Sequence, residues 1–178
     1  MENVRLLKAQ KDDLSFIYNI YDRIINHLEN THNFTGWKKG IYPTDEVANK
    51  AFDNNELFKL VNNENVIIGT TVLNHEQSIY YSDVKWSYQE KNEKEILVVH
   101  TLCIDPNYLK LGYAATLMEL IKEYAKKINA KAIRLDVSFN NTPGYNLYLK
   151  SGYKDVGKVN LHLNRPGFKW WHTMELIL

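Results

Sequence analysis

Some segments of the chain repeat apolar residues every three to four positions, as in a helix. Others are continuous apolar runs or place an apolar residue at every second position, as in a strand. In residues 11–30 the apolar residues follow i, i+3, i+4, i+7, the pattern of an amphipathic helix. Asp12 and Asp13 lie near its start, where the helix dipole favours acids. Residues 96–104 form the most apolar run and are followed by Asp105-Pro106-Asn107. Such a run predicts a central strand buried on both faces.

The remaining elements follow from the same periods and from the turn residues between them. Helical spacing predicts helices over residues 44–52, 113–129 and 143–150. Apolar or alternating runs predict strands over residues 4–7, 57–61, 66–73, 132–137, 156–163 and 170–177. The strands 57–61 and 66–73 are expected to form a hairpin. Residues 75–94 are polar and aromatic with weak periodicity, which predicts a long loop with a functional role.

This order of elements contains no internal repeat, linker or low-complexity stretch. It predicts one α/β (α+β) domain over residues 1–178, with a mixed central β-sheet flanked by helices. A chain of 178 residues fits one domain and can bury a core without metal or disulfide staples.

Composition excludes several classes of protein. The formal net charge is +1, which argues against a dedicated nucleic-acid binder. No apolar run approaches the roughly 18 residues that a membrane span needs. The charged N-terminus does not resemble a signal peptide, and the single cysteine, Cys103, fits a reducing compartment, so we expect a cytoplasmic protein. The six histidines show no metal-binding motif and one cysteine cannot build a zinc cluster, so no metal is expected.

Gly112 lies between the buried strand 96–104 and the helix that begins near Tyr113. A helix N-terminus presents unpaired N–H groups and partial positive charge, which suit a phosphate. The small residues Ala114 and Ala115 would leave the backbone accessible. An ordinary strand-to-helix turn explains this segment equally simply. The P-loop and dinucleotide-binding motifs are both absent.

A second segment, about 30 residues later, changes the interpretation. It reads Asn141-x-x-Gly144-x-x-Leu147-Tyr148-x-x-x-Gly152-Tyr153 and follows the next strand. Together the two segments resemble the GNAT superfamily of N-acetyltransferases, whose first motif is [Gln/Arg]-x-x-Gly-x-[Gly/Ala]. Gly112 and Ala114 match that motif, whereas Leu109 departs from it. Gly144 stands where the family often has Ala and should cost some helix stability.

The resemblance implies that the ligand is acetyl-CoA. Backbone groups of Leu102, Cys103 and Ile104 would pair with the pantetheine arm, and Asn141 would contact the same region. The pyrophosphate would be held by the loop and first helical turn, formed by Leu109, Lys110, Leu111, Gly112, Tyr113, Ala114 and Ala115. Lys110 and Lys150 are candidates for the 3′-phosphate, although solvated surface lysines explain them more simply.

Acetyl transfer to an amine needs an acid for the departing thiolate and a route for the amine's proton. The family's general acid falls on Tyr148, which would also contact the cofactor. His100 is the first candidate base, because imidazole exchanges protons near neutral pH, but a core histidine is an equally good interpretation. Glu95 and Asp136 are weaker candidates. Cys103 lies in an apolar run, which argues against a covalent acetyl-enzyme and for direct transfer in a ternary complex.

The acceptor is expected to meet Trp37, Tyr42, Trp86 and His100, because loops after the first helix and after the strands flank the acceptor groove in this family. Core packing explains each aromatic equally well. The resemblance thus implies an N-acetyltransferase for a small-molecule, peptide or protein amine. A non-catalytic acetyl-CoA sensor or adaptor is the alternative, and an unrelated nucleotide binder is a third. Trp170 and Trp171 fit either a homodimer contact or a terminal core strand.

Overall fold

Seven strands in the order β1-β2-β3-β4-β5-β7-β6 form one sheet in the computed structural model, which describes residues 4–178. Four α-helices accompany them in the described chain. β4 and β5 are parallel, whereas the pairs β1–β2, β2–β3, β5–β7 and β6–β7 are antiparallel. The expected mixed sheet with helices is confirmed. By its internal contacts the chain divides into two units, which are described in turn.

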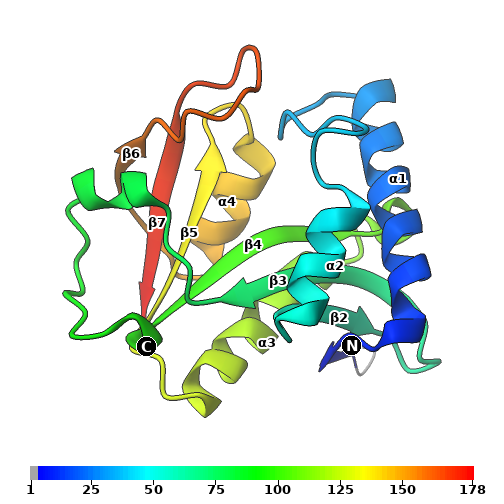
Figure 1. Cartoon of the computed structure of the whole chain (residues 1–178), viewed down its shortest axis with the longest axis horizontal. Coiled ribbons are helices and arrows are strands. Elements are labelled where there is room, and N and C mark those ends of the chain that lie inside the picture. Colours follow the sequence, from blue (N-terminus) through cyan, green and yellow to red (C-terminus); the bar gives the residue numbers. More distant parts are fainter. Residues whose placement is uncertain (1–3) are drawn as a thin grey trace. The chain divides into compact units, whose positions relative to one another are not determined.

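The first unit comprises residues 4–33, 37–73 and 100–120 of the described chain. It contains β1 (Arg5–Lys8), β2 (Leu57–Val61) and most of β3 (Ile67–Asn74), with Leu57 opposite Val72 in the β2–β3 hairpin. The helices α1 (Leu14–Asn30) and α2 (Asp45–Asp53) lie side by side (Figure 1). Most of the predicted apolar face of α1 is buried, although Leu14 and Tyr18 are half-buried. The buried residues of the helix are Ile17, Ile20, Tyr21, Ile24, Ile25 and Leu28.

The second unit comprises residues 34–36, 74–99 and 121–178. β5 (Ala132–Ser138) pairs along its whole length with β7 (Trp171–Ile177), and β6 (Lys154–Val159) lies on the other side of β7. α4 (Thr142–Lys150) follows β5. β4 (Ile96–Ile104) and α3 (Tyr113–Lys127) each pass from one unit to the other.

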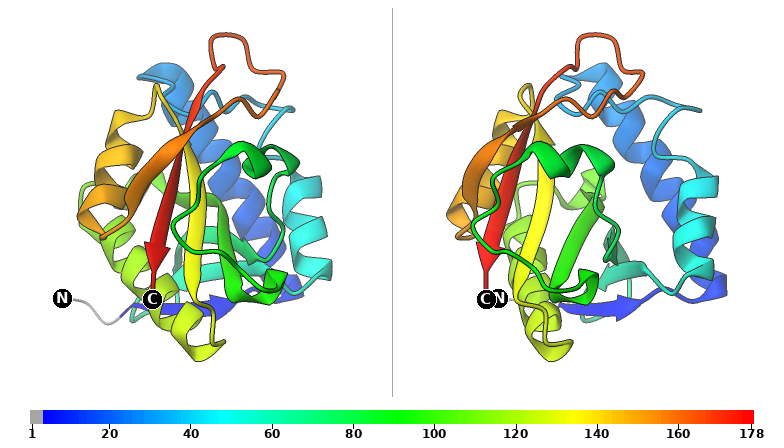
Figure 2. Two further views of the ribbon diagram at one scale, coloured as in Figure 1. Left: turned by 90° about the vertical axis from the view of Figure 1, so that its left-hand side faces the viewer. Right: turned by 60° about the vertical axis from the view of Figure 1, so that its left-hand side comes forward.

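The segment 75–95, defined here as the strap, contains only the short 3-10 turns Ile79–Asp83 and Glu93–Glu95, as the weak periodicity predicted. In Figure 2 it runs as a green ribbon across β5 and β7. Its aromatic residues pack on the second unit in a cluster made of Tyr81, Trp86, Val159, Leu161 and Trp171. The strap is therefore a covering layer of the second unit rather than a free loop.

The predicted C-terminal end of the strand 156–163 is wrong. β6 stops at Val159, whereas the alternation of apolar residues predicted a strand to residue 163. The backbone of His162 is left-handed, with φ of 50°, which ends the extended conformation. Residues 160–170 instead form the loop that leads into β7.

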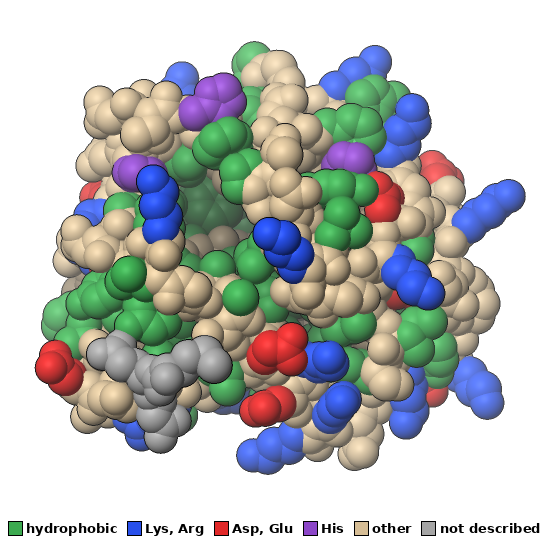
Figure 3. Space-filling view, turned by 180° about the vertical axis from the view of Figure 1, so that it is seen from behind, with side chains coloured by type: hydrophobic (Ala, Val, Ile, Leu, Met, Phe, Trp, Pro, Cys, Tyr) green, Lys and Arg blue, Asp and Glu red, His purple; other side chains and the backbone are tan. Residues whose placement is uncertain are grey.

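Charged side chains of both signs are interspersed on the face drawn in Figure 3, in keeping with the small net charge. No helix of the described residues is long and apolar enough to cross a membrane. Within residues 4–178 there is also no cluster of three or more His, Cys, Asp or Glu side chains arranged to hold a metal ion.

Candidate functional site

In the first unit, the predicted phosphate loop leads from β4 into α3 through two left-handed residues. Lys110 has φ of 63° and Gly112 has φ of 86°. These conformations turn the chain sharply before α3 begins at Tyr113. A Cβ added at Gly112 would meet no atom within 4 Å, so the backbone there faces open space. The first turn of α3 contains no acidic residue, so nothing in it opposes an anion.

The turn before this loop is held by a buried carboxylate. Asp105 accepts hydrogen bonds from the backbone N–H of Asn107 at 3.1 Å and from the guanidinium of Arg23, whose Nη2 lies 2.6 Å from Oδ2. Arg23 belongs to α1, so the ion pair joins that helix to the end of β4. The position of the loop is therefore fixed by groups outside it.

The end of β4 carries an irregularity in its backbone. Thr101 is buried and has φ of 49°, a left-handed conformation that a β-branched residue rarely adopts. Its hydroxyl is hydrogen-bonded to the hydroxyl of Tyr42. Tyr42 also packs edge-on against the buried Trp37, with ring centroids 5.9 Å apart. Two predicted acceptor residues thus lie together and are tied to β4.

The other predicted residues of β4 occupy different environments. His100 is half-buried, and its carbonyl accepts a hydrogen bond from the Thr71 hydroxyl at 3.1 Å. Cys103 is buried, which raises the pKa of its thiol to about 12. A Cβ at Gly69 on β3 would lie 2.8 Å from the Cys103 carbonyl oxygen, so the glycine allows the close approach of that backbone. The environment of Cys103 fits the prediction of an unreactive thiol.

In the second unit, Asn141 is the N-cap of α4. Its side-chain oxygen accepts a hydrogen bond from the Gly144 N–H at 3.0 Å. A Cβ at Gly144 would lie 2.6 Å from Asn141 Nδ2 and 2.9 Å from its Cγ. Glycine at this position therefore makes room for the capping side chain, which explains the departure from the alanine of the family motif.

We expect Asn141→Ala to lower the free energy of unfolding by about 1 kcal/mol, because the first turn of α4 loses its side-chain acceptor. Urea unfolding followed by circular dichroism measures this. Asn141→Asp, which keeps an acceptor, should retain most of the stability. Asn146→Ala, in the exposed interior of the same helix, is the matched control and should be nearly neutral. Equal losses for Asn141→Ala and Asn146→Ala would contradict the capping role.

Tyr148, the predicted acid, lies on α4 and is half-buried. Burial, and secondly the negative charge of Asp136, raise the pKa of its hydroxyl well above the ordinary value. Asp136 lies on β5 and accepts a hydrogen bond from the Tyr81 hydroxyl, with 2.6 Å between Oη and Oδ2. The raised pKa keeps the Tyr148 hydroxyl protonated at neutral pH.

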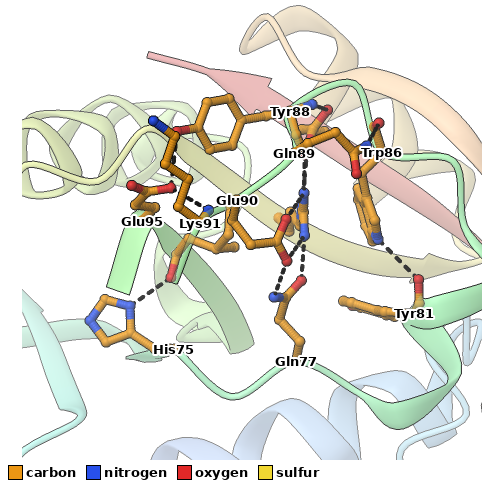
Figure 4. A network of polar contacts seen from close by, with 12 residues as sticks. His75, Gln77, Tyr81, Trp86, Tyr88, Gln89, Glu90, Lys91 and Glu95 are labelled. Carbon is orange, nitrogen blue, oxygen red and sulfur yellow. Dashed lines mark hydrogen bonds and ion pairs between the residues drawn. The ribbon is translucent and has the colours of Figure 1, made fainter. Parts of the chain in front are cut away.

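Trp86, the last predicted acceptor residue, is buried in the strap. Its indole N–H donates to the Tyr81 carbonyl at 3.1 Å, and its ring faces the Arg134 guanidinium at 4.3 Å (Figure 4). Neither Arg134 nor Tyr81 was predicted from the sequence. The available signal was an arginine inside the apolar run 132–137, since a charged side chain is almost never fully buried without a partner.

Comparison with known proteins identifies the class. The profile of the "Acetyltransferase (GNAT) family" matches residues 17–153. The chain belongs to this family and is an acyltransferase.

A curated relative, the N-alpha-acetyltransferase of Sulfurisphaera tokodaii, is 29% identical over 89 residues. That match covers 47% of this chain and 53% of the relative, so only about half of the relative's length is spanned. Among solved structures, an acetyltransferase of the GNAT family from Streptococcus agalactiae has a TM-score of 0.80 at 15% identity, covering 98% of this chain and 95% of that one. Spermidine N-acetyltransferase from Vibrio cholerae, in complex with CoA and spermine, has a TM-score of 0.69 at 20% identity with the same coverage. These structures share the fold.

Proposed function

We propose that the chain transfers an acetyl group from acetyl-CoA to a primary amine of a small molecule, peptide or protein, directly and without an acetyl-enzyme. The observation that carries the proposal is the position of Tyr148, half-buried on α4 in the same unit as Asp136, whose negative charge is the second cause, after burial, of the raised pKa of its hydroxyl. This reaction needs a proton donor for the leaving thiolate and a proton acceptor for the amine. The burial of Cys103 supports direct transfer, because its thiol stays protonated at neutral pH.

The cofactor contacts are proposed from the family resemblance. Backbone groups of residues 102–104 bind the pantetheine arm, the N–H groups of residues 109–115 bind the pyrophosphate, and Asn141 contacts the pantetheine region. The left-handed turn at Gly112 and the open space beside it support the pyrophosphate assignment. Asn141 uses its side-chain oxygen as an N-cap, so its amide nitrogen is the group we assign to the cofactor.

In the proposed reaction the amine nitrogen attacks the acetyl carbonyl carbon. A C–N bond forms, the C–S bond breaks, and CoA leaves as a thiolate. Tyr148 gives its hydroxyl proton to that sulfur, and the second proton that the amine nitrogen loses as the amide forms restores the Tyr148 hydroxyl. The amine must first lose a proton, because an ammonium has no lone pair and an alkylamine has a pKa of about 10.4.

Two side chains are candidates for receiving the amine's proton. His100 is the residue indicated by the sequence, and its half-buried position is compatible with that role. Asp136 is favoured by a specific observation, since its charge acts on the hydroxyl of the proposed acid. When Asp136 takes up the proton its charge disappears, and the Tyr148 pKa falls as the thiolate develops. Deprotonation of the acceptor would then promote protonation of the leaving group.

The acceptor class is proposed from the relatives. One similar structure contains spermine and one relative is an N-alpha-acetyltransferase, so a polyamine and a peptide α-amine are the two leading candidates. Trp37 and Tyr42 are proposed acceptor contacts, whereas the buried Trp86 contacts Tyr81 and Arg134 inside the second unit. A cytoplasmic location and a homodimer remain predictions from the sequence.

Calorimetric titration with acetyl-CoA tests the proposal first. We expect a micromolar dissociation constant, about −8 kcal/mol, with CoA comparable and ATP much weaker. Release of CoA thiol is then measured with spermine, spermidine and a peptide carrying a free N-terminal amine. Thiol release establishes the enzyme. Tight binding with no turnover on any amine would favour the acetyl-CoA sensor or adaptor, and no binding by folded protein would overturn the cofactor assignment.

A further inference from the structure

A buried arginine fixes the strap to the second unit. The side chain of Arg134, on β5, is 1% exposed. Its Nε donates to Glu175 on β7 at 3.1 Å, and its two terminal nitrogens donate to the two carboxylate oxygens of Glu90 at 2.9 Å each. One of them also donates to the Tyr88 carbonyl at 2.6 Å. A bidentate pair of this kind defines the position of the strap as well as stabilising it.

The remaining contacts of the guanidinium also come from the strap. Gln77 accepts from Nη1 at 2.6 Å, and the ring of Trp86 covers one face of the group. Figure 4 shows Gln77, Glu90 and Trp86 converging from separate parts of the strap. Each N–H group of Arg134 therefore has an acceptor, so the cluster is complete within this unit.

The strap then reaches the proposed active-site carboxylate through Tyr81. The Tyr81 carbonyl is bound by the Trp86 indole, the two rings lie 5.1 Å apart, and the Tyr81 hydroxyl donates to Asp136. Arg134 and Asp136 are two residues apart on β5, so their side chains project from the same face of the strand. The strap thus contacts that face of β5 at two neighbouring side chains, Arg134 and Asp136.

We propose that Tyr81 is a positioning residue that orients the carboxylate of Asp136 for the ammonium group of the acceptor, and that the Arg134 cluster holds Tyr81 in place. The inference rests on the proposed function and deepens it. A carboxylate on a short side chain rotates freely unless it is held. Tyr81 is 4% exposed and is packed on several sides, so its hydroxyl is a rigid donor that fixes Asp136.

Tyr81→Phe is the direct test. We expect the KM for the amine to rise about tenfold, the effect of one hydrogen bond to a charged group, with the acetyl-CoA dissociation constant unchanged. The amine is whichever of spermine, spermidine or the free-amine peptide the wild-type protein acetylates fastest. Tyr88→Phe is the matched control, because it removes a strap hydroxyl that donates to Glu95 at 3.0 Å and keeps the backbone carbonyl to which Arg134 donates. It should leave both constants unchanged.

Glu90→Gln tests the role of the cluster without removing the buried arginine, whose loss could prevent folding. It should raise the KM for the amine in the same direction as Tyr81→Phe and by a smaller factor, again without changing acetyl-CoA binding. Glu93→Gln, an exposed change in the same strap, is its control. Thermal denaturation of all four variants separates a loss of folded protein from a change in KM.

An unchanged amine KM in folded Tyr81→Phe would overturn the inference while leaving acetyl transfer intact. An equal loss of amine and acetyl-CoA affinity would also overturn it, because that result indicates a general structural role. The wild-type protein is further titrated with spermine, spermidine and the free-amine peptide in the presence of CoA. A wild-type protein that neither acetylates nor binds any of the amines would overturn the proposed function, and this inference with it.

Discussion

Tyr148→Phe should lower kcat for acetyl transfer roughly 100-fold, the low end of the contribution of a general acid. The affinity for acetyl-CoA should change little, because the variant removes only the hydroxyl. Without it the thiolate of CoA leaves with no proton donor, and thiolate expulsion becomes the slow step. Steady-state kinetics at saturating acetyl-CoA and amine, together with calorimetry, separate the two effects.

Tyr145→Phe is the matched control for this experiment. Tyr145 lies on the same helix, three residues earlier, and its hydroxyl donates to Asp155 at 3.1 Å. Its loss should leave kcat unchanged, since Asp155 lies outside the pair formed by Asp136 and Tyr148. If Tyr148→Phe retained the wild-type kcat, Tyr148 would have no part in the reaction and the assignment of the acid would have to move.

Where the sequence pattern is continuous, the predicted elements agree with the structure. The bounds of β2 and β4 were predicted correctly, because each is a short apolar run between polar turns. The end of β6 was not, because Leu161 and Leu163 continue the alternation beyond Val159. Leu161 is buried in the cluster under the strap, so its apolar character reflects packing outside the sheet. Alternating apolar residues indicate which side chains are buried, but a buried side chain can also lie in a loop.

The residues of the candidate site also differ in how far the sequence alone could identify them. Gly112, Asn141 and Tyr148 could be proposed from the sequence because they lie in motifs, whose spacing along the chain can be recognised without the fold. The partners of Arg134 are Glu175, 41 positions away, and Glu90, 44 positions away. No local pattern joins these residues. The sequence showed an arginine among apolar neighbours, and only the fold shows which carboxylates compensate its charge.

Gly112→Val should reduce acetyl-CoA affinity by a factor on the order of 100 to 1,000. Two causes add: a β-branched residue is strained at a left-handed position by about 1–2 kcal/mol, and a displaced N–H loses a charge-assisted hydrogen bond worth about 1.5–3 kcal/mol. The open space beside Gly112 is where the phosphate is proposed to lie, so the isopropyl group would occupy it. Calorimetric titration with acetyl-CoA measures the loss.

Backbone strain alone would also disturb the loop, and Gly167→Val controls for this. Gly167 has φ of 83°, nearly the value at Gly112, and an added Cβ there also meets no atom within 4 Å. Both variants should therefore lose similar thermal stability, whereas only Gly112→Val should lose acetyl-CoA binding. Gly112→Ala should fall between wild type and Gly112→Val, because it adds the strain with a smaller side chain. Normal affinity in Gly112→Val would place the pyrophosphate elsewhere and leave α3 as an ordinary helix after a strand.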